Sequence, residues 1–281
     1  MSPAAPLLYE EVVRRALAED LGRAGDITTD ATVPADRSGE AAIVARAAGR
    51  VAGLEVALFA FRALDPSATA ETLHPDGTDV AGDAVLARVR GRARALLTGE
   101  RTALNFLGHL SGIATATRDV VRRLDGLGTR VACTRKTTPG LRALEKYAVQ
   151  VGGGESHRYG LDDAVLIKDN HLAIAGGITP AVKSARGWVG HMVKLELEVE
   201  TLDQLDEALA LGVDVVLLDN MDLETLREAV RRARGRVLTE ASGGIRPEDV
   251  RPVAATGVDI ISLGWLTHSA PSLDVALDIS S

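Results

Sequence analysis

The sequence is short of cysteine, of aromatic residues, of long apolar runs and of net positive charge, and each shortage excludes a class of protein. The single cysteine, Cys133, cannot build a disulfide framework or a zinc cluster. Aromatic residues make up 3% of the chain and the formal net charge is −7, which argues against nucleic-acid binding. No apolar run approaches the roughly 20 residues that cross a bilayer, and no signal peptide is evident. We therefore expect a soluble, cytoplasmic enzyme that binds neither nucleic acid nor membranes.

Lysine is also scarce, and its positions are informative. Of the 32 basic residues 27 are arginine and 5 are lysine, and no lysine precedes Lys136. A lipoyl- or biotinyl-type carrier needs a lysine for attachment, so the N-terminal half is not such a carrier. The hydrophobic fraction of 46% over 281 residues is enough for one large domain or two smaller ones.

The first part of the chain predicts an α+β domain. Leu8–Leu21 is amphipathic at helical spacing, whereas Glu40–Val51 and Ala84–Leu97 alternate as strands do. In the second of these strands Arg88, Arg90, Arg92 and Arg94 would share one face, and Glu100–Leu124 reads as a pair of helices. We expect residues 1–110 to form this N-terminal domain.

From Arg130 onward, short β-branched runs alternate with helical segments, a pattern that predicts parallel strands. Six strand–helix units are fewer than the eight of a closed barrel, so we expect an open (incomplete) parallel α/β barrel over residues 111–268. The predicted strands are Arg130–Cys133, Ala164–Ile167, Met192–Val199, Val213–Leu218, Arg236–Thr239 and Asp259–Leu263, and the predicted helices are Gly140–Val151, Thr201–Leu211, Leu223–Ala233 and Pro247–Thr256.

Charged side chains follow these strands, where an α/β barrel carries its active site. Lys194, Glu196, Glu198 and Glu200 share one face of the third predicted strand by their period of two. They face either solvent, as on an edge strand, or the barrel mouth; helices cover the outside of barrel strands, which favours the barrel mouth. Buried charges must be paired or coordinated. The best candidates to hold Mg²⁺, directly or through water, are therefore Glu198 on this strand and Asp219, which directly follows the fourth predicted strand.

Two further groups have both an ordinary and a functional interpretation. The segment Ser242–Pro247 (S-G-G-I-R-P) is either a simple turn or a phosphate cradle, which Gly264 would complete. Lys146 and Lys183 are interpreted as helix-surface residues. Six cationic side chains are each ordinary surface charges when taken singly, but together they suit an anionic substrate: Arg101, Arg135, Lys136, His157, Arg158 and Lys168.

The residues at these positions form strings that closely resemble the quinolinate phosphoribosyltransferase family over nearly the whole chain. The strings are E-D-L-G-R-A-G-D-I-T-T-D (19–30), E-R-T-A-L-N-F-L-G-H-L-S-G-I-A-T (100–115), C-T-R-K-T-T-P-G-L-R-A-L-E-K-Y-A-V (133–149), G-G-G-E-S-H-R (152–158), A-V-L-I-K-D-N-H (164–171), E-L-E-V-E (196–200), L-L-D-N (217–220) and E-A-S-G-G-I (240–245). Their combination is highly specific, although no single string is. Cys133 departs from the aspartate that many relatives carry.

The resemblance implies a reaction, a fold and a set of residue roles. Quinolinate and phosphoribosyl pyrophosphate would give nicotinate mononucleotide, pyrophosphate and CO₂ with Mg²⁺, in NAD biosynthesis. The implied fold is an N-terminal α/β sandwich domain over residues 1–110, joined by the C-terminal tail 269–281, followed by an open α/β barrel over residues 111–268. The resemblance also implies a homodimer in which Arg101 reaches the active site of the partner. Quinolinate would be bound by Arg101, Arg135, His157, Arg158 and Lys168; the catalytic and metal-side residues would be Lys136, Glu198 and Asp219; and Lys136, Ser242, Gly243, Gly244, Gly264 and His268 would hold the phosphoribosyl group and its phosphate.

Two alternatives are distinguishable by experiment. A related phosphoribosyltransferase that acts on another ring acid would release neither CO₂ nor pyrophosphate with quinolinate. A barrel that only senses a phosphorylated ligand would bind without turnover.

Overall fold

The computed structural model describes residues 5–280 and separates into two compact units. The first unit comprises residues 1–118, 137–153 and 266–281, and the second comprises residues 119–136 and 154–265. The expected domain boundary at residue 110 falls inside the helix α4 (Ala93–Arg123). Among the described residues, no helix is both long and apolar enough to cross a membrane.

The first unit is built on a four-stranded antiparallel sheet in the order β13-β1-β5-β3. The strands are β1 (Ser38–Ala45), β3 (Thr69–Thr72), β5 (Ala84–Arg92) and β13 (Val275–Ser280). The last strand of the chain thus pairs with the first strand of the sheet. A second, two-stranded sheet pairs β2 (Gly49–Arg50) with β4 (Asp79–Val80).

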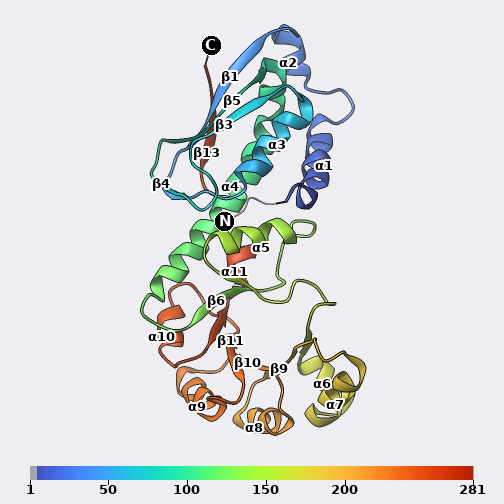
Figure 1. Ribbon diagram of the computed structural model, residues 1–281, viewed down its shortest axis with the longest axis vertical. Coiled ribbons are helices and arrows are strands. Elements are labelled where there is room, and N and C mark those ends of the chain that lie inside the picture. Colours follow the sequence, from blue (N-terminus) through green and yellow to red (C-terminus); the bar gives the residue numbers. More distant parts are fainter. Residues whose placement is uncertain (1–4, 281) are drawn as a thin grey trace. The chain divides into compact units, whose positions relative to one another are not determined.

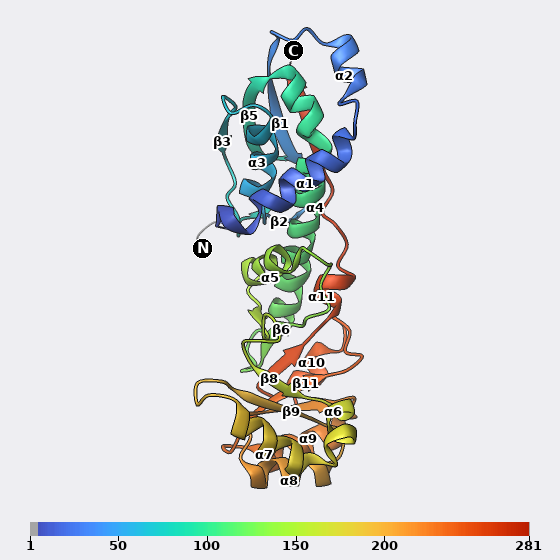
Figure 2. The ribbon, with the colours of Figure 1, turned by 90° about the vertical axis from the view of Figure 1, so that its right-hand side faces the viewer.

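Helices surround the sheets of the first unit (Figure 1 and Figure 2), and all of them except η1 contribute buried residues. They are η1 (Pro6–Leu8), α1 (Glu10–Leu21), α2 (Ile27–Thr32), α3 (Leu54–Leu64), α4 and α5 (Arg142–Val151). Seven consecutive or near-consecutive residues of α3 are buried, so this helix is enclosed on almost every side. The ring of Tyr9 meets that of Phe59 edge to face at 5.6 Å, next to the start of α1. Such aromatic pairs add to the apolar burial that holds the two helices together.

Two expectations for the segment before residue 124 are wrong. The strand expected to reach Leu97 ends at Arg92, and the helix pair expected over Glu100–Leu124 is the single helix α4. Arg94 is therefore not on the strand face; its Nε donates to the carbonyl of Val33 at 2.8 Å. The helix is continuous through Gly112. Only glycine fits at this position, because the chain at Pro271 lies against the helix and a Cβ would collide with the Pro271 carbonyl.

The interpretation of Lys146 as a surface residue is also wrong, since it is only 2% exposed, whereas Lys183 is exposed. The helix α5 buries Glu145, which is 0% exposed, next to Lys146. The charged residues of α5 suggest an exposed helix, and the sequence pattern therefore did not reveal that two of them are buried.

The second unit is an open sheet of seven parallel strands in the order β7-β6-β12-β11-β10-β9-β8, which confirms the expected incomplete α/β barrel. Six of the strands correspond to the six predicted ones, and the two-residue edge strand β7 was not predicted. Their bounds are β6 (Arg130–Cys133), β7 (Glu155–Ser156), β8 (Val165–Ile167), β9 (Leu195–Val199), β10 (Val215–Asp219), β11 (Leu238–Ser242) and β12 (Ile260–Ser262).

Helices follow these strands and lie along their outer side, as Figure 1 shows for α7, α8 and α9. The helices are α6 (Asp169–Ala175), α7 (Ile178–Trp188), α8 (Leu202–Leu211), α9 (Leu223–Ala233), α10 (Val250–Ala254) and α11 (Trp265–His268), of which α6 and α7 were not predicted. The helix α8 begins at a capping box, in which Thr201 accepts from the N–H of Gln204 and the Gln204 side chain accepts in return. Caps of this kind start a helix directly after a strand end, which fixes where the residues at that end lie.

Candidate active site

A cavity of about 560 Å³ opens in the second unit at the carboxyl ends of the parallel strands. This is the edge at which α/β barrels bind their ligands. Ten of the residues singled out from the sequence line it. The lining residues are Thr134, Arg135, Lys136, His157, Arg158, Leu166, Lys168, Glu198, Leu217, Asp219, Asn220, Glu240, Ser242, Gly243, Gly244 and Ser262.

The strand β9 divides the predicted charged face in a way that the alternation did not show. Glu196 is buried and the side chain of Glu198 is 12% exposed, so these two carboxylates are inside the barrel, as expected. Lys194 and Glu200 lie outside the strand and do not line the cavity, and the expected place of Lys194 in the barrel mouth is wrong because it precedes the amino end of β9. Lys194 is exposed and pairs with Asp214 at 2.8 Å instead. The alternation of side chains between the two faces holds only within the strand, from Leu195 to Val199.

Positive side chains gather on one side of the cavity. Arg135 and Lys136 follow β6, Arg158 follows β7, and Lys168 follows β8. Burial and the neighbouring guanidinium of Arg135 lower the pKa of Arg158. Two guanidinium groups in one partly buried place repel each other, so this side of the cavity is suited to an anion with more than one negative charge.

Carboxylates occupy the neighbouring strand ends. An oxygen of Glu198 lies 3.6 Å from Nζ of Lys168, and Asp219 accepts a hydrogen bond from the Asn220 side chain at 2.6 Å. Burial raises the pKa of Glu198; Lys168 opposes this rise, and the charges of Asp219 and Asp169 add to it. A buried carboxylate whose pKa is raised by neighbouring negative charges lies where a bound cation is favourable.

The loop after β11 exposes main chain to the same cavity. Gly243 and Gly244 have φ values of +92° and +60°, and a Cβ at Gly243 would lie 2.8 Å from the backbone nitrogen of Asn220. Only glycine fits there without strain. The helix that follows is only five residues long and begins at Val250, so backbone N–H groups of the loop, rather than a helix terminus, are the donors available to a phosphate.

Three residues singled out from the sequence lie elsewhere. Arg101 lies on α4 and lines a cavity of about 660 Å³ in the first unit, together with His109 and Pro139. Gly264 lies just after β12, and it is not among the described residues that line the 560 Å³ cavity. His268 ends α11 and is exposed, with its Nδ1 2.6 Å from Oγ of Ser269.

Sequence reasoning missed a group of buried polar side chains at the cavity, two of which, Glu240 and Ser262, line it. Glu196, Glu240 and Ser262 are 6%, 3% and 4% exposed, and each has a side-chain oxygen without a hydrogen-bond partner among the described residues. In the sequence Glu240 stands out only as the first residue of the string E-A-S-G-G-I. The available signal was a glutamate within a short strand between helical segments, L-E-L-E-V for β9 and L-T-E-A-S for β11, because a buried carboxylate is costly unless the group has a task.

The fold and the site together define an α/β-barrel enzyme whose cavity is lined by cationic side chains, carboxylates and a glycine loop. Two family models cover nearly the whole chain: the N-terminal domain of quinolinate phosphoribosyl transferase matches residues 26–111, and its C-terminal domain matches residues 113–278. The chain belongs to the quinolinate phosphoribosyltransferase family, which confirms the resemblance found in the sequence.

Individual relatives agree with this membership. The chain is 45% identical to a probable nicotinate-nucleotide pyrophosphorylase (carboxylating) of Bacillus subtilis, over 98% of this chain and 94% of the relative. It is 43% identical to the nicotinate-nucleotide pyrophosphorylase (carboxylating) of Mycobacterium leprae, over 96% of each. The crystal structure of NadC from Streptococcus pyogenes superposes with a TM-score of 0.95 at 38% identity, and the match covers 100% of each chain.

Proposed function

We propose that this protein transfers the phosphoribosyl group of phosphoribosyl pyrophosphate to quinolinate with decarboxylation, giving nicotinate mononucleotide, pyrophosphate and CO₂ in NAD biosynthesis. The observation that carries the proposal is the cavity itself. Cationic side chains and two carboxylates from different strand ends line one space, in a chain that belongs to this family. The relatives named above are pyrophosphorylases with the same carboxylating designation.

Quinolinate carries two carboxylates and would lie on the cationic side of the cavity. Arg135, Arg158 and Lys168 offer charge-assisted hydrogen bonds, which are strong and directional. His157 lines the same space, and it belongs to the proposed quinolinate site. This set holds the ring so that its nitrogen faces the ribose, which lowers the entropic cost of the attack.

The phosphoribosyl pyrophosphate would lie along the acidic side and the glycine loop. Ser242, Gly243 and Gly244 offer donors to the 5-phosphate, and Lys136 balances the charge of the pyrophosphate. Glu198 and Asp219 offer the carboxylate oxygens that suit Mg²⁺, because Mg²⁺ is bound by one or two carboxylates together with substrate phosphates. When bound, Mg²⁺ supplies neutralisation of the leaving pyrophosphate. Gly264 and His268 remain proposed members of the phosphate site.

The chemistry needs no side-chain nucleophile. The bond between ribose C1 and the pyrophosphate oxygen breaks with its electron pair on oxygen, and the carboxylates of Glu198 and Asp219 stabilise the positive charge that develops at C1. The quinolinate nitrogen then bonds to C1 and becomes a positively charged pyridinium. The bond to the 2-carboxylate breaks, CO₂ leaves, the cationic ring holds the remaining electron pair at C2, and that carbon takes a proton from solvent.

We propose further that the protein acts as a homodimer in the cytoplasm. Arg101 of one protomer would complete the quinolinate site of the other. The support is that Arg101 is exposed on α4, in a different unit from the other proposed quinolinate ligands. The cytoplasmic location is the prediction from the sequence, and fractionation of cells that express the protein would test it.

The deciding experiment compares quinolinate with nicotinate as acceptor, with phosphoribosyl pyrophosphate and Mg²⁺ present. We expect stoichiometric pyrophosphate and CO₂ from quinolinate, and no CO₂ from nicotinate. No pyrophosphate release from quinolinate, with turnover of another ring acid, would favour the related phosphoribosyltransferase. Tight ligand binding without any turnover would favour the sensor.

A further inference from the structure

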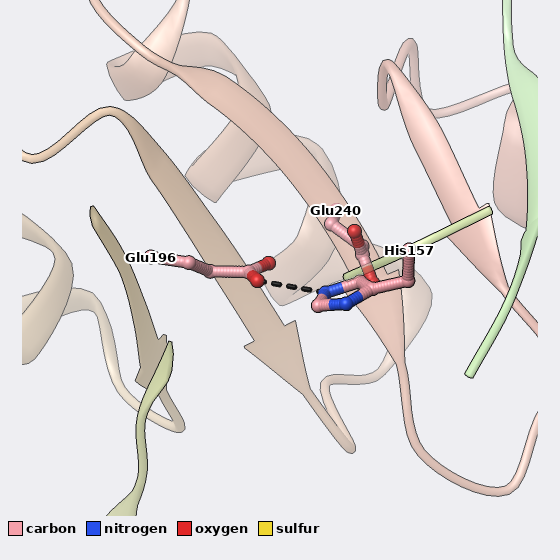
Figure 3. Close-up of side chains that lie close together, drawn as sticks. All are labelled: His157, Glu196 and Glu240. Atoms are coloured by element: carbon pink, nitrogen blue, oxygen red, sulfur yellow. Dashed lines mark hydrogen bonds and ion pairs between the residues drawn. The ribbon is translucent and has the colours of Figure 1, made fainter. Parts of the chain in front are cut away.

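At the wall of the cavity, three side chains from three different segments lie close together (Figure 3), and two of them, His157 and Glu240, line the cavity. His157 follows β7, Glu196 lies on β9 and Glu240 lies on β11. Nε2 of His157 is 2.7 Å from an oxygen of Glu196 and 3.7 Å from an oxygen of Glu240. Only the first distance is that of a hydrogen bond, so the two glutamates do not have the same relation to the ring.

These residue types could hold a metal ion, since their donor atoms lie within 4.8 Å of one another. The second ring nitrogen decides against this arrangement. A histidine that ligates a metal through Nε2 donates from Nδ1 to an acceptor. Here Nδ1 of His157 accepts the backbone N–H of Arg158 at 2.7 Å. Nδ1 therefore carries no proton, and Nε2 carries the one that is donated to Glu196.

The hydrogen bonds form a line from the floor of the barrel to the substrate side of the cavity. Glu196, buried on β9, accepts a hydrogen bond from Nε2 of His157, and Nδ1 of the same ring accepts the main-chain N–H of Arg158. The guanidinium of Arg158 donates to the carbonyl of Ala164 at 3.3 Å and lines the cavity. A carboxylate that is buried with one unpartnered oxygen is costly, and such a group is retained where it has a task.

We propose that Glu196 is a positioning residue for quinolinate: through the imidazole of His157 it fixes the main chain of Arg158, and thereby the place of the Arg158 guanidinium in the cavity. This inference rests on the proposed function and adds a further task for His157, the support of its neighbour. Glu196 does not touch substrate. The phosphoribosyl pyrophosphate side of the cavity, at Glu198 and Ser242–Gly244, does not depend on this line of hydrogen bonds.

The test separates the two substrates. In Glu196→Leu we expect the KM for quinolinate to rise about ten- to a hundredfold, as for a lost buried hydrogen bond, while the KM for phosphoribosyl pyrophosphate changes by less than about threefold. Glu196→Gln keeps an oxygen that accepts from Nε2 and should restore the KM for quinolinate to within about threefold of wild type. Equal rises in both KM values, or no rescue by glutamine, would overturn the proposal.

A double-mutant cycle tests the route through Arg158. If Glu196 acts by placing that guanidinium, Glu196→Leu should cost less than about threefold in the Arg158→Lys background, because the two changes are coupled. Full additivity would show that Glu196 acts in another way. Glu155→Gln is the matched control: this exposed carboxylate lies two residues before His157 and pairs with Arg130 at 3.0 Å, so neither KM should change.

One measurement is made on the wild-type protein itself. In the ¹⁵N spectrum of histidine-labelled wild-type protein at pH 8, Nδ1 of His157 should be unprotonated and Nε2 protonated; the spectrum of His157→Asn serves only to assign these signals. Protonation of Nδ1 would remove its acceptor for Arg158 and overturn the proposal. If Nδ1 is protonated in a protein that converts quinolinate, the positioning role of Glu196 is refuted and the proposed function stands. If the wild-type protein is inactive on quinolinate, the proposed function itself is refuted.

Discussion

At the scale of single residues, charge pairing is concentrated at Asp79 in the first unit. Asp79 accepts from Arg50 Nε at 2.8 Å and Arg50 Nη2 at 2.9 Å, and its Oδ1 also accepts from Arg118 at 2.9 Å. The hydrogen bonds from Arg50 contribute most to holding the pKa of Asp79 well below its usual range. A carboxylate held by two guanidinium groups stabilises the fold as a network does, more than an isolated surface pair.

We expect Asp79→Asn to lower the free energy of unfolding by about 1–2 kcal/mol at pH 7. Because the pKa is lowered in the folded state, this stabilisation is fully present above the unfolded-state pKa near 4 and is lost as the pH falls below it. Urea unfolding at pH 7 and pH 3 should therefore show a difference between variant and wild type that shrinks in acid. Asp83→Asn is the control, since Asp83 is mostly exposed, has a φ of +63° that asparagine tolerates, and lies 3.7 Å from Arg46.

At the scale of elements, β11 carries a buried carboxyl group whose charge is unfavourable. Burial, together with the nearby Glu196 carboxylate, raises the pKa of Glu240 to about 7. A raised pKa means that the folded state binds the proton more tightly than the unfolded state does. The resulting stability is fully present below the unfolded-state pKa of about 4.5 and is lost as the pH rises through 7.

The wild-type protein should thus lose stability between pH 5 and pH 8, by an amount on the order of 2–3 kcal/mol. Glu240→Gln carries no titrating proton and should lose much less over the same interval. Urea unfolding at the two pH values measures both. Parallel loss of stability in the two proteins would show that another group titrates. Glu248→Gln is the control, because Glu248 is exposed and its carboxylate lies 3.8 Å from Arg246, which is too far for a hydrogen bond.

The loop after β11 gives the second prediction at this scale. Gly243→Ala places a Cβ against the backbone nitrogen of Asn220 and at a φ of +92°, so the loop must move. We expect the KM for phosphoribosyl pyrophosphate to rise at least about tenfold, with the KM for quinolinate nearly unchanged. Gly235→Ala has a similar φ of +72° but open space around the Cβ, outside the cavity. Gly235→Ala should change only the free energy of unfolding. An equal rise in the KM for phosphoribosyl pyrophosphate in Gly235→Ala would show that the contact with Asn220 does not explain the effect of Gly243→Ala.

At the scale of the whole molecule, the proposed homodimer allows one active site to be built from two defective chains. Arg101→Ala and Lys168→Ala proteins should each be nearly inactive with quinolinate, because each lacks a cationic ligand of the dianion. After subunit exchange, half of the dimers are mixed, and each mixed dimer has one complete site. Mixing should thus restore about a quarter of the wild-type activity.

Subunit exchange must be verified independently, for example by mass spectrometry of differently labelled chains. An exchanged mixture with no recovered activity would contradict the shared site. Recovery would not be expected from Lys168→Ala mixed with Glu198→Ala, since both residues line the same cavity of one chain. That pair is the matched negative control.

How far the sequence predicts the molecule differs between its parts. The strands of the second unit were predicted to within a few residues, because β-branched runs between helical segments form parallel strands almost wherever they occur. The edge strand β7 has only two residues and offers no such run. The segment of α6 and α7, Asp169–Trp188, was missed for a different reason, since its mixed small and polar residues give a weak helical pattern.

The sequence by itself determined the family, the open α/β barrel and the charged strand ends, because motif strings and local periodicity are properties of neighbouring residues. Tertiary structure alone decided how deep each group lies. Glu196 and Glu198 are equivalent by alternation, yet one is 6% exposed beneath the cavity and bonded to His157, whereas the other lines it beside Lys168. Depth and partners come from segments distant in the chain, and no local pattern contains them.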